Sequence, residues 1–386
     1  RSATWCRRTG VVGLMLGVIW LGWVAVSETY IRTYCFQQVQ AMEYTHRPRG
    51  ECPIVKLARE SPGGWGSLPP AAGVSGEGGD RALAAAGGGV HKGAQLGGAG
   101  EGSGEEEHRS RFGIVLMCDQ GMWPEKYTQM SLDNKQAYAD LHGYDVIIAT
   151  SADVDHTRPA AWSKLLVLEK HLGDYDYLIF VDIDAFIMNP TFKLEWLLDV
   201  ARKQQQTDGV DGVDGWVEPD MIVTKDWNGP NSGVIVIKNS EYSHWMLREW
   251  WDQKQLVNGD FPFNYEQRAM HYLLQPDSWT EQGLPFYEDY EVVRAHTVVL
   301  DQCAMNSYLV HPWQELLGKT KHMGSSASYV KGDFMLHFAG KKGRVRTNLV
   351  DYYYPLAVKA MEEYKESLKA DQPDESGASG PGPVNR

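Results

Sequence analysis

Residues 177–190 read YLIFVDIDAFIMNP, and this stretch decides how the rest of the chain is interpreted. Its first part, Tyr177–Val181, is apolar or aromatic throughout, which is typical of a fully buried β-strand. Two acids, Asp182 and Asp184, follow directly. Side chains two positions apart on an extended chain point to the same side. We therefore expect both carboxylates at the carboxyl end of a central strand, where open α/β sheets bind their ligands.

Two explanations of this D-x-D remain open on these residues alone. Carboxylates that share one side repel each other, and a divalent cation that bridges phosphate oxygens would relieve the repulsion. A strand that ends in a turn with two solvated aspartates fits the same letters equally well. The rest of the chain has to distinguish the two.

Composition narrows the function classes. The chain has 386 residues and a formal net charge of −13, and no basic stripe offsets that charge, so a nucleic-acid partner is not expected. The 14 Trp and 19 Tyr residues are many for this length. Aromatic faces suit sugar stacking as well as protein cores.

An uncharged apolar segment, Val11–Val26, follows Arg7 and Arg8. At about 1.5 Å per residue it is slightly short for an average bilayer core of roughly 30 Å, but it suits a thinner early-secretory membrane. A cleaved signal peptide is the alternative. We expect an uncleaved anchor over residues 11–27, with residues 1–10 belonging to an incomplete cytosolic tail and everything downstream in the lumen.

The remaining domain limits follow composition. Residues 28–110 are expected to form a stem, which from Ser61 onward is a Gly-rich linker too poor in apolar residues to fold. A folded domain is expected over residues 111–370, and a disordered tail over 371–386.

The folded domain opens with alternating strands and helices. We expect strands at Phe112–Cys118 and Asp145–Ala149, and helices at Tyr127–His142 and Ala161–Leu172, before the strand Tyr177–Val181. This order predicts parallel βαβ units of a nucleotide-binding type. No glycine-rich phosphate loop follows the first strand, which argues against dinucleotide enzymes and P-loop ATPases. Any phosphates would have to be neutralised by a metal ion and side chains.

Further elements follow the D-x-D. We expect strands at Met221–Thr224, Val234–Lys238 and Asp333–Phe338, a polar loop at 227–233, an extended segment at Val292–Leu300, and helices at Ser240–Gln255, Glu266–Leu274 and Asp351–Leu368. The chain has 5 Cys and no metal-type spacing. Cys118 and Cys303 could be core thiols or a disulfide, and the sequence does not choose between them.

Polar groups at the ends of predicted strands form a candidate site: Asp182, Asp184, His337 and Lys342. Two carboxylates and an imidazole suit Mn²⁺, and a lysine beyond them could hold diphosphate oxygens. Taken singly, His337 is better explained as a core histidine and Lys342 as a surface lysine. Together the four residues indicate a metal site only if the fold brings their segments of the chain together.

Several motifs in order resemble the fungal galactosyl- and mannosyltransferase family, which includes the plant xyloglucan xylosyltransferases. They are NKQAYADLHGY (134–144), RPAAWSKL (158–165), YDYLIFVDIDAF (175–186), GPNSGVIVIKNS (229–240), YEQRAMHYLL (265–274) and GDFMLHFAGKKG (332–343). The resemblance covers about Phe112–Gly343, nearly all of the expected folded part.

The resemblance implies a fold, an activity and a place in the cell. The fold would be α/β, of the GT-A nucleotide-diphospho-sugar transferase type, in a single Rossmann-like catalytic domain. The activity would be Mn²⁺-dependent transfer, with retention, of galactose, mannose or xylose from a UDP- or GDP-sugar to an oligosaccharide or polysaccharide. The protein would be a single-pass type II Golgi membrane protein with a luminal domain, as a monomer or as a homo- or hetero-oligomer.

The resemblance also implies site residues. Asp182, Asp184 and His337 match the metal ligands, with Asp182 facing the ribose or the metal. Asp182, Lys164, Asn231, Gly233 and Lys342 match the donor site, and Gln267, Glu266 and Lys342 match the catalytic residues.

The chain departs from the plant enzymes at three positions. Tyr265 stands where they have an acid, Ser232 where they have Ala, and Lys341 where they have Cys. Because Tyr265 replaces an acid of the plant enzymes, xylose and xyloglucan specificity is not carried over.

Retention needs either a covalent glycosyl-enzyme or front-face attack. Gln267 is a poor nucleophile, so we favour front-face attack with Lys342 and the metal on the leaving group. Two alternatives stay open: a catalytically inactive luminal glycan-binding protein on the same fold, and a nucleotide-sugar hydrolase.

Overall fold

The computed structural model describes residues 52, 110–118, 125–207, 218–226, 228–257, 266–280, 283–309 and 328–370. The chain divides into two units, residues 1–50 and 51–386, and all described residues belong to the second. The expected anchor at 11–27 and the tail at 371–386 lie outside the described residues. Within the part that is described, no helix is long and apolar enough to cross a membrane.

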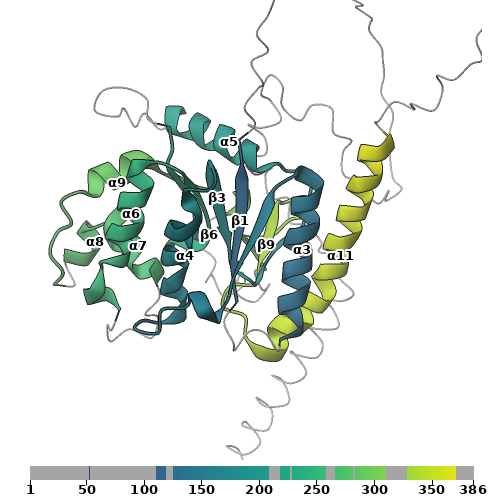
Figure 1. The fold of residues 1–386 in the computed structure, drawn as a ribbon, viewed down its shortest axis with the longest axis horizontal. Helices are drawn as coiled ribbons and strands as arrows, with labels where there is room; N and C mark the ends of the chain where they lie inside the picture. The colour runs from purple at the N-terminus through teal and green to yellow at the C-terminus, as the bar shows by residue number, and fades with distance from the viewer. Residues whose placement is uncertain are drawn as a thin grey trace, which may run out of the picture. The chain divides into compact units, whose positions relative to one another are not determined.

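A central mixed sheet carries the domain (Figure 1). Its order is β2 (Asp145–Ala149), β1 (Phe112–Met117), β3 (Tyr177–Val181), β6 (Gly229–Lys238), β5 (Met221–Asp226) and β7 (Thr297–Leu300). The first strand, β1, pairs in parallel with both β2 and β3, so the expected βαβ units are confirmed. On its other edge β3 pairs antiparallel with β6, and this places the D-x-D beside the expected GPNSG loop.

Burial of the apolar strands holds the sheet in the interior. Every residue of β3 is buried, and Leu178 and Phe180 pack in a cluster with residues of α4 (Ser163–Leu172), α6 (Glu241–Trp251) and α7 (Glu266–Leu274). Full burial of one such side chain stabilises a fold by about 1.5–3 kcal/mol. In Figure 1 these three helices lie on one side of the sheet, while α3 (Lys126–His142) and α11 (Gly343–Ala370) lie on the other.

A second, smaller sheet lies directly after the D-x-D. Its order is β4 (Ala185–Ile187), β9 (Met335–His337) and β8 (Ser307–Tyr308). The antiparallel pairing of β4 with β9 sets Ala185 opposite His337. Neither β4 nor β8 was expected from the sequence, because strands of two or three residues leave no periodic pattern. This pairing brings a late segment of the chain to the D-x-D.

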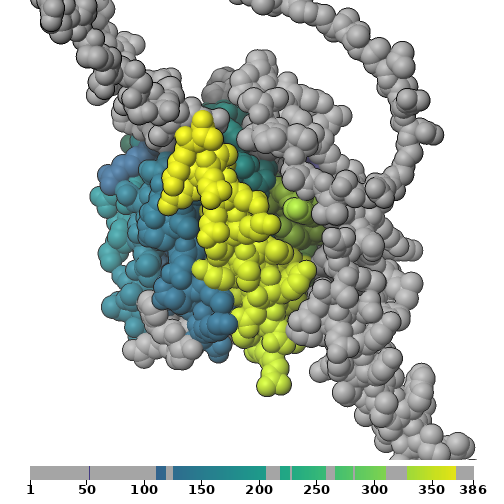
Figure 2. Space-filling model, turned by 90° about the vertical axis from the view of Figure 1, so that its right-hand side faces the viewer, coloured from purple at the N-terminus to yellow at the C-terminus, as the bar shows by residue number. Residues whose placement is uncertain are grey.

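Where a glycine ends a helix, the observed limit agrees with the one expected from the sequence. The left-handed Gly143, with φ of 71°, ends α3 as expected, because glycine adopts this conformation at little cost. The last helix, α11, begins at Gly343, earlier than the expected Asp351, and lies beside α3 on one face of the domain (Figure 2). The remaining helical segments are α5 (Leu194–Thr207), α8 (Asp277–Thr280), η1 (Ser151–Asp153), η2 (Ala160–Trp162), η3 (Lys254–Leu256) and η4 (Gln302–Ala304).

Two expected segments have different structures. The first half of Val292–Leu300 belongs to α9 (Tyr290–His296), and only Thr297–Leu300 is extended, as β7. The helix buries Val293 completely, so packing outweighs the local preference of β-branched residues for strands. The expected loop at 227–233 is mostly strand, because Gly229–Gly233 belongs to β6, with Asn231 paired to Thr224.

One disulfide joins distant parts of the chain. Cys303, in η4, pairs with Cys52 and not with Cys118, and the two Cα atoms are 6.3 Å apart. Cys118 is buried and outside any disulfide. The sequence could not reveal this pairing, because Cys52 lies 251 residues before its partner.

We expect Cys52→Ser to destabilise the domain by about 2–5 kcal/mol, since the disulfide restricts the unfolded chain. Chemical denaturation of the wild-type and variant chains measures the difference. Dithiothreitol should destabilise the wild-type chain to the same degree and leave the variant unaffected. An unchanged denaturation midpoint in the variant would contradict a structural role for this disulfide.

Candidate metal and donor site

The D-x-D lies in the turn between β3 and β4. The backbone N–H of Asp182 donates to the carbonyl of Gly233 at 2.7 Å, and that of Ala185 donates to the carbonyl of Asp182 at 3.0 Å. The turn is therefore fixed by β6 on one side and by its own backbone on the other. The Asp182 side chain is 34% exposed and that of Asp184 is 14% exposed. Both carboxylates are accessible from only a limited part of the surface.

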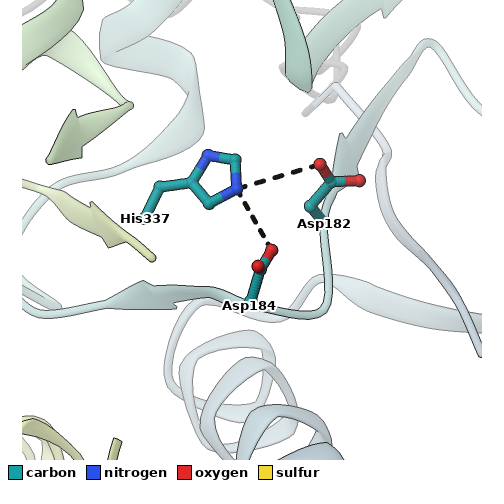
Figure 3. Close-up of side chains that lie close together, drawn as sticks. All are labelled: Asp182, Asp184 and His337. Carbon is teal, nitrogen blue, oxygen red and sulfur yellow. Dashed lines mark hydrogen bonds and ion pairs between the residues drawn. The ribbon is translucent and has the colours of Figure 1, made fainter. Parts of the chain in front are cut away.

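His337 meets both carboxylates, as Figure 3 shows. Its Nε2 lies 3.1 Å from Asp184 Oδ1 and 3.8 Å from Asp182 Oδ2. One ligand atom from each of the three residues lies within 4.8 Å of the others. Because Ala185 and His337 are paired across β4 and β9, the sheet itself sets this approach. The two segments, whose convergence the sequence left open, therefore meet at these three residues.

Two residues that sequence reasoning missed hold the outer atoms of this group. Asn306 Oδ1 lies 2.6 Å from His337 Nδ1, which donates to it, and this bond orients the ring so that Nε2 faces the two carboxylates. Arg346 Nη1 lies 3.2 Å from Asp184 Oδ2, and its guanidinium packs over the Tyr127 ring at 4.3 Å. No motif in the sequence pointed to Asn306 or Arg346.

The charged side chains of the site shift one another's pKa values. Burial alone would raise the pKa of Asp184, but His337 and Arg346 outweigh it and lower that pKa to about 2. Burial raises the pKa of Asp182 despite the opposing charges of Lys164 and His337. For His337, burial favours the neutral ring, yet the two carboxylates raise its pKa overall. Lys164, His337 and Arg346 thus supply the positive charges that offset the two carboxylates in this structure.

The donor set fits a divalent metal ion. Two carboxylates and one imidazole, with Asp184 Oδ1 and His337 Nε2 facing each other, combine hard oxygen and intermediate nitrogen ligands. The outer atoms of both side chains are already bonded to Arg346 and Asn306. Outer contacts of this kind orient ligands in metal sites. Asp182, Asp184 and His337 would hold the ion.

A buried ion pair lies next to the group. Lys164 Nζ is 2.6 Å from Glu266 Oε1, 3.5 Å from Asp182 Oδ1 and 3.1 Å from the carbonyl of Ser232. Burial lowers the pKa of Lys164, but Asp182 and Glu266 outweigh this effect and raise it overall. Lys164 therefore stays protonated and links the D-x-D to the start of α7.

The GPNSG segment connects the remaining expected residues. Ser232 donates from its backbone N–H to Gln267 Oε1 at 3.2 Å and from its Oγ to Glu266 Oε1 at 2.7 Å. Asn231 accepts the Gly233 N–H at 2.8 Å and donates to Asp226 and to the Tyr308 hydroxyl, each at 2.9 Å. The strand β6 thus joins both the D-x-D and the Glu266–Gln267 pair.

Lys342 lies apart from these contacts. It is exposed in the turn between β9 and α11, and among the described residues no hydrogen bond or ion pair links it to the other site residues. Arg346, one helical turn further on, reaches Asp184. The role expected for Lys342 stays a prediction, and Tyr265 lies outside the described residues.

Comparison with known proteins identifies the family. Residues 114–346 match the galactosyl transferase GMA12/MNN10 family, and the chain belongs to it. The resemblance read from the sequence motifs is therefore confirmed. The mixed sheet with the D-x-D at the end of β3 agrees with the GT-A type of α/β fold expected for this family.

The chain is also similar to named glycosyltransferases of fungi and plants. The probable alpha-1,6-mannosyltransferase MNN10 of Saccharomyces cerevisiae is 28% identical over 249 residues, which are 60% of each chain. An alpha-1,2-galactosyltransferase of Schizosaccharomyces pombe is 25% identical over 55% of this chain and 56% of its own length. Xyloglucan 6-xylosyltransferase 1 of Arabidopsis thaliana is 27% identical over 33% of this chain and 26% of its own. The matches to the two fungal relatives thus span less than two thirds of their lengths.

Solved structures are more distant. A glycosyltransferase involved in glycosylation of the major capsid of PBCV-1 has a TM-score of 0.41 at 13% identity, and covers 63% of this chain and 99% of its own. GlyE of Streptococcus pneumoniae has a TM-score of 0.39 at 13% identity, over 69% of this chain and 66% of its own.

We expect Gly233→Ala to weaken divalent-metal binding by about 10- to 100-fold, as loss of ligand orientation does. A Cβ at this position would lie 2.5 Å from His337 Cε1 and 2.8 Å from Asp182 Oδ2, so both ligands would have to move. Calorimetric titration with Mn²⁺ measures the effect. Gly173→Ala is the control, because a Cβ there meets no atom within 4 Å. Equal affinities in the two variants would contradict this account of the site.

Proposed function

We propose that this chain is a Mn²⁺-dependent, retaining glycosyltransferase that moves galactose, mannose or xylose from a nucleotide-sugar donor to a glycan acceptor. The observation that carries the proposal is the Asp182–Asp184–His337 group at a sheet edge, in a member of a galactosyl transferase family. Relatives named for mannose, galactose and xylose transfer support these three sugars equally.

The proposed mode of donor binding rests on the charged side chains at the carboxyl end of β3. Asp182, Asp184 and His337 would hold Mn²⁺, which when bound supplies positive charge to the diphosphate of a UDP- or GDP-sugar. Lys164, Asn231 and Gly233 would line the donor pocket, with Lys164 fixed by Glu266. Lys342 would pair with the diphosphate as the leaving group acquires charge.

The reaction proposed at the sugar is front-face attack by the acceptor hydroxyl. Glu266 Oε1 accepts from Lys164 at 2.6 Å and from Ser232 Oγ at 2.7 Å, and the side chain is only 2% exposed, which disfavours its attack on a bound sugar. Gln267 is neutral and hydrogen-bonded to Ser232. Gln267 and Glu266 would therefore orient the sugar and stabilise positive charge at its anomeric carbon.

The proposed location is the Golgi lumen, behind a type II anchor at 11–27. The Cys52–Cys303 disulfide supports this location, because disulfides form and persist in oxidising compartments and are rare in the cytosol. The catalytic domain would act there on oligosaccharide or polysaccharide acceptors, alone or in homo- or hetero-oligomers.

A panel of nucleotide sugars separates the candidate functions. The purified chain is incubated with Mn²⁺, each UDP- or GDP-sugar, and oligosaccharide acceptors, and the products are analysed by mass spectrometry. We expect one donor to give an extended acceptor with retained configuration. Free sugar alone would indicate a hydrolase, and no turnover with retained glycan binding would indicate an inactive binding protein.

We expect Asp184→Ala to abolish Mn²⁺-dependent binding of UDP or GDP, because the metal would lose a ligand that lies 3.1 Å from His337. Calorimetry with each nucleotide, with and without Mn²⁺, measures the loss. Asp174→Ala is the matched control, since Asp174 is exposed shortly before β3. Unchanged Mn²⁺-dependent binding in Asp184→Ala would refute the metal assignment.

We expect no covalent glycosyl adduct on Glu266 during turnover, since its side chain is only 2% exposed and its carboxylate is paired with the Lys164 ammonium. Intact-protein and peptide mass spectrometry of the chain, quenched during reaction with its donor, tests this. A glycosylated Glu266 peptide would replace front-face attack with a two-step mechanism.

A further inference from the structure

Helix α3 buries polar side chains on the face that meets the segment after the D-x-D. Asn134, Lys135, Tyr138 and His142 are all buried, at helical spacing. Each bonds to the backbone of that segment: Lys135 to the Ala185 carbonyl, Asn134 to Ile187, His142 to the Pro190 carbonyl, and Tyr138 to the Phe192 carbonyl. The NKQAYADLHGY motif thus has a structural role that its sequence alone did not suggest.

Asn134 takes the place of a neighbouring strand for β4. Its Nδ2 donates to the Ile187 carbonyl at 2.9 Å, and its Oδ1 accepts the Ile187 N–H at 2.8 Å. β4 is an edge strand, because among the described strands β9 is its only neighbour in the small sheet. Buried backbone groups need partners. Asn134 satisfies both groups of Ile187 on the open side and so fixes where β4 lies.

Lys135 is a fully buried lysine behind the D-x-D. Its ammonium donates to Ser131 Oγ at 2.6 Å and to the Ala185 carbonyl, and lies 4.7 Å from the centre of the Phe186 ring. Burial lowers the pKa of Lys135 to about 7, although Asp184 and Asp182 oppose this shift. A buried ammonium is costly. The negative charges of Asp184 and Asp182 offset part of that cost.

Lys135 bonds to the backbone of Ala185, and the position of this residue determines how Asp184 and His337 face each other. Ala185 follows Asp184 directly and is paired with His337 across β4 and β9. The N–H of Phe338 also donates to the Asp184 carbonyl at 2.9 Å. A shift of β4 by a fraction of an ångström would therefore change the separation of Asp184 and His337. Bonds from α3 to β4 restrict this shift from the side opposite to β9.

We propose that Asn134 and Lys135 are positioning residues for the metal site: by holding β4 against β9, they keep Asp184 and His337 at the spacing that binds a divalent ion. This inference rests on the proposed metal dependence. It assigns a function to two buried residues whose bonds to β4 are made with its backbone.

Tyr138 offers a matched control on the same helix. Its hydroxyl donates to the Phe192 carbonyl at 2.7 Å, the same kind of bond from a buried side chain, but well beyond the end of β4. A general stabilising role for α3 would make all three residues equivalent. A positioning role separates Asn134 and Lys135 from Tyr138.

The test compares Asn134→Leu and Lys135→Met with Tyr138→Phe in the full chain. Mn²⁺ affinity is measured by calorimetry with Mn²⁺ alone, and the thermal midpoint is measured for each variant. We expect the first two variants to bind Mn²⁺ at least about 10-fold more weakly, the usual scale for loss of ligand support, and Tyr138→Phe to lower only the thermal midpoint. Folded Asn134→Leu and Lys135→Met with wild-type affinity would overturn the inference, as would an equal loss in Tyr138→Phe.

Hydrogen exchange on the wild-type chain provides a second measurement if the variants do not fold. Because coupling between two sites is reciprocal, Mn²⁺ should slow exchange of the Ile187 amide, which Asn134 holds. An unchanged rate in the metal-bound protein would overturn the inference while leaving the metal site intact. A wild-type chain that does not bind Mn²⁺ at all would overturn the proposed metal dependence, and this inference with it.

Discussion

Two carboxylates placed side by side at the end of β3 are the constraint on which this structure depends. Asp182 and Asp184 repel each other, and the fold brings positive or proton-donating groups to them from separate parts of the chain: Lys164 from α4, His337 from β9 and Arg346 from α11. Each of these contacts requires a long-range packing arrangement. The small sheet and the early start of α11 can be understood as means of placing them.

The same constraint explains why several charged and polar side chains are buried at the site. Lys164 and Glu266 form an ion pair in the interior, and such a pair is costly unless its remaining hydrogen-bonding capacity is used. Ser232 meets part of that demand by bonding to both partners. The site is thus a connected network from α4 through β6 to α7. A substitution of one of these residues would change the hydrogen bonds of the others.

Sequence reasoning predicted the elements with strong local signals. The strand at Tyr177–Val181 and the helix at Glu266–Leu274 have the expected limits, because their apolar patterns and the residues that end them are local. It missed what depends on pairing across the chain. The three-residue β4 has no pattern of its own, and Asn306 and Arg346 become site residues only once β9 and α11 have packed. Val292 and Val293 favoured a strand, but packing made them helical.

The disulfide described above has a consequence for how far the domain can extend from a membrane. Cys52 is bonded to Cys303, so residues 53–109 connect two points that both belong to the domain, Cys52 and Ser110. A chain of that length could span at most roughly 200 Å when fully extended, and none of this length can add to the reach of a tether. If an anchor lies at 11–27, only residues 28–51 link it to the domain while the disulfide is intact. Reduction would release the rest, so the oxidation state would set the radius in which acceptors can be met.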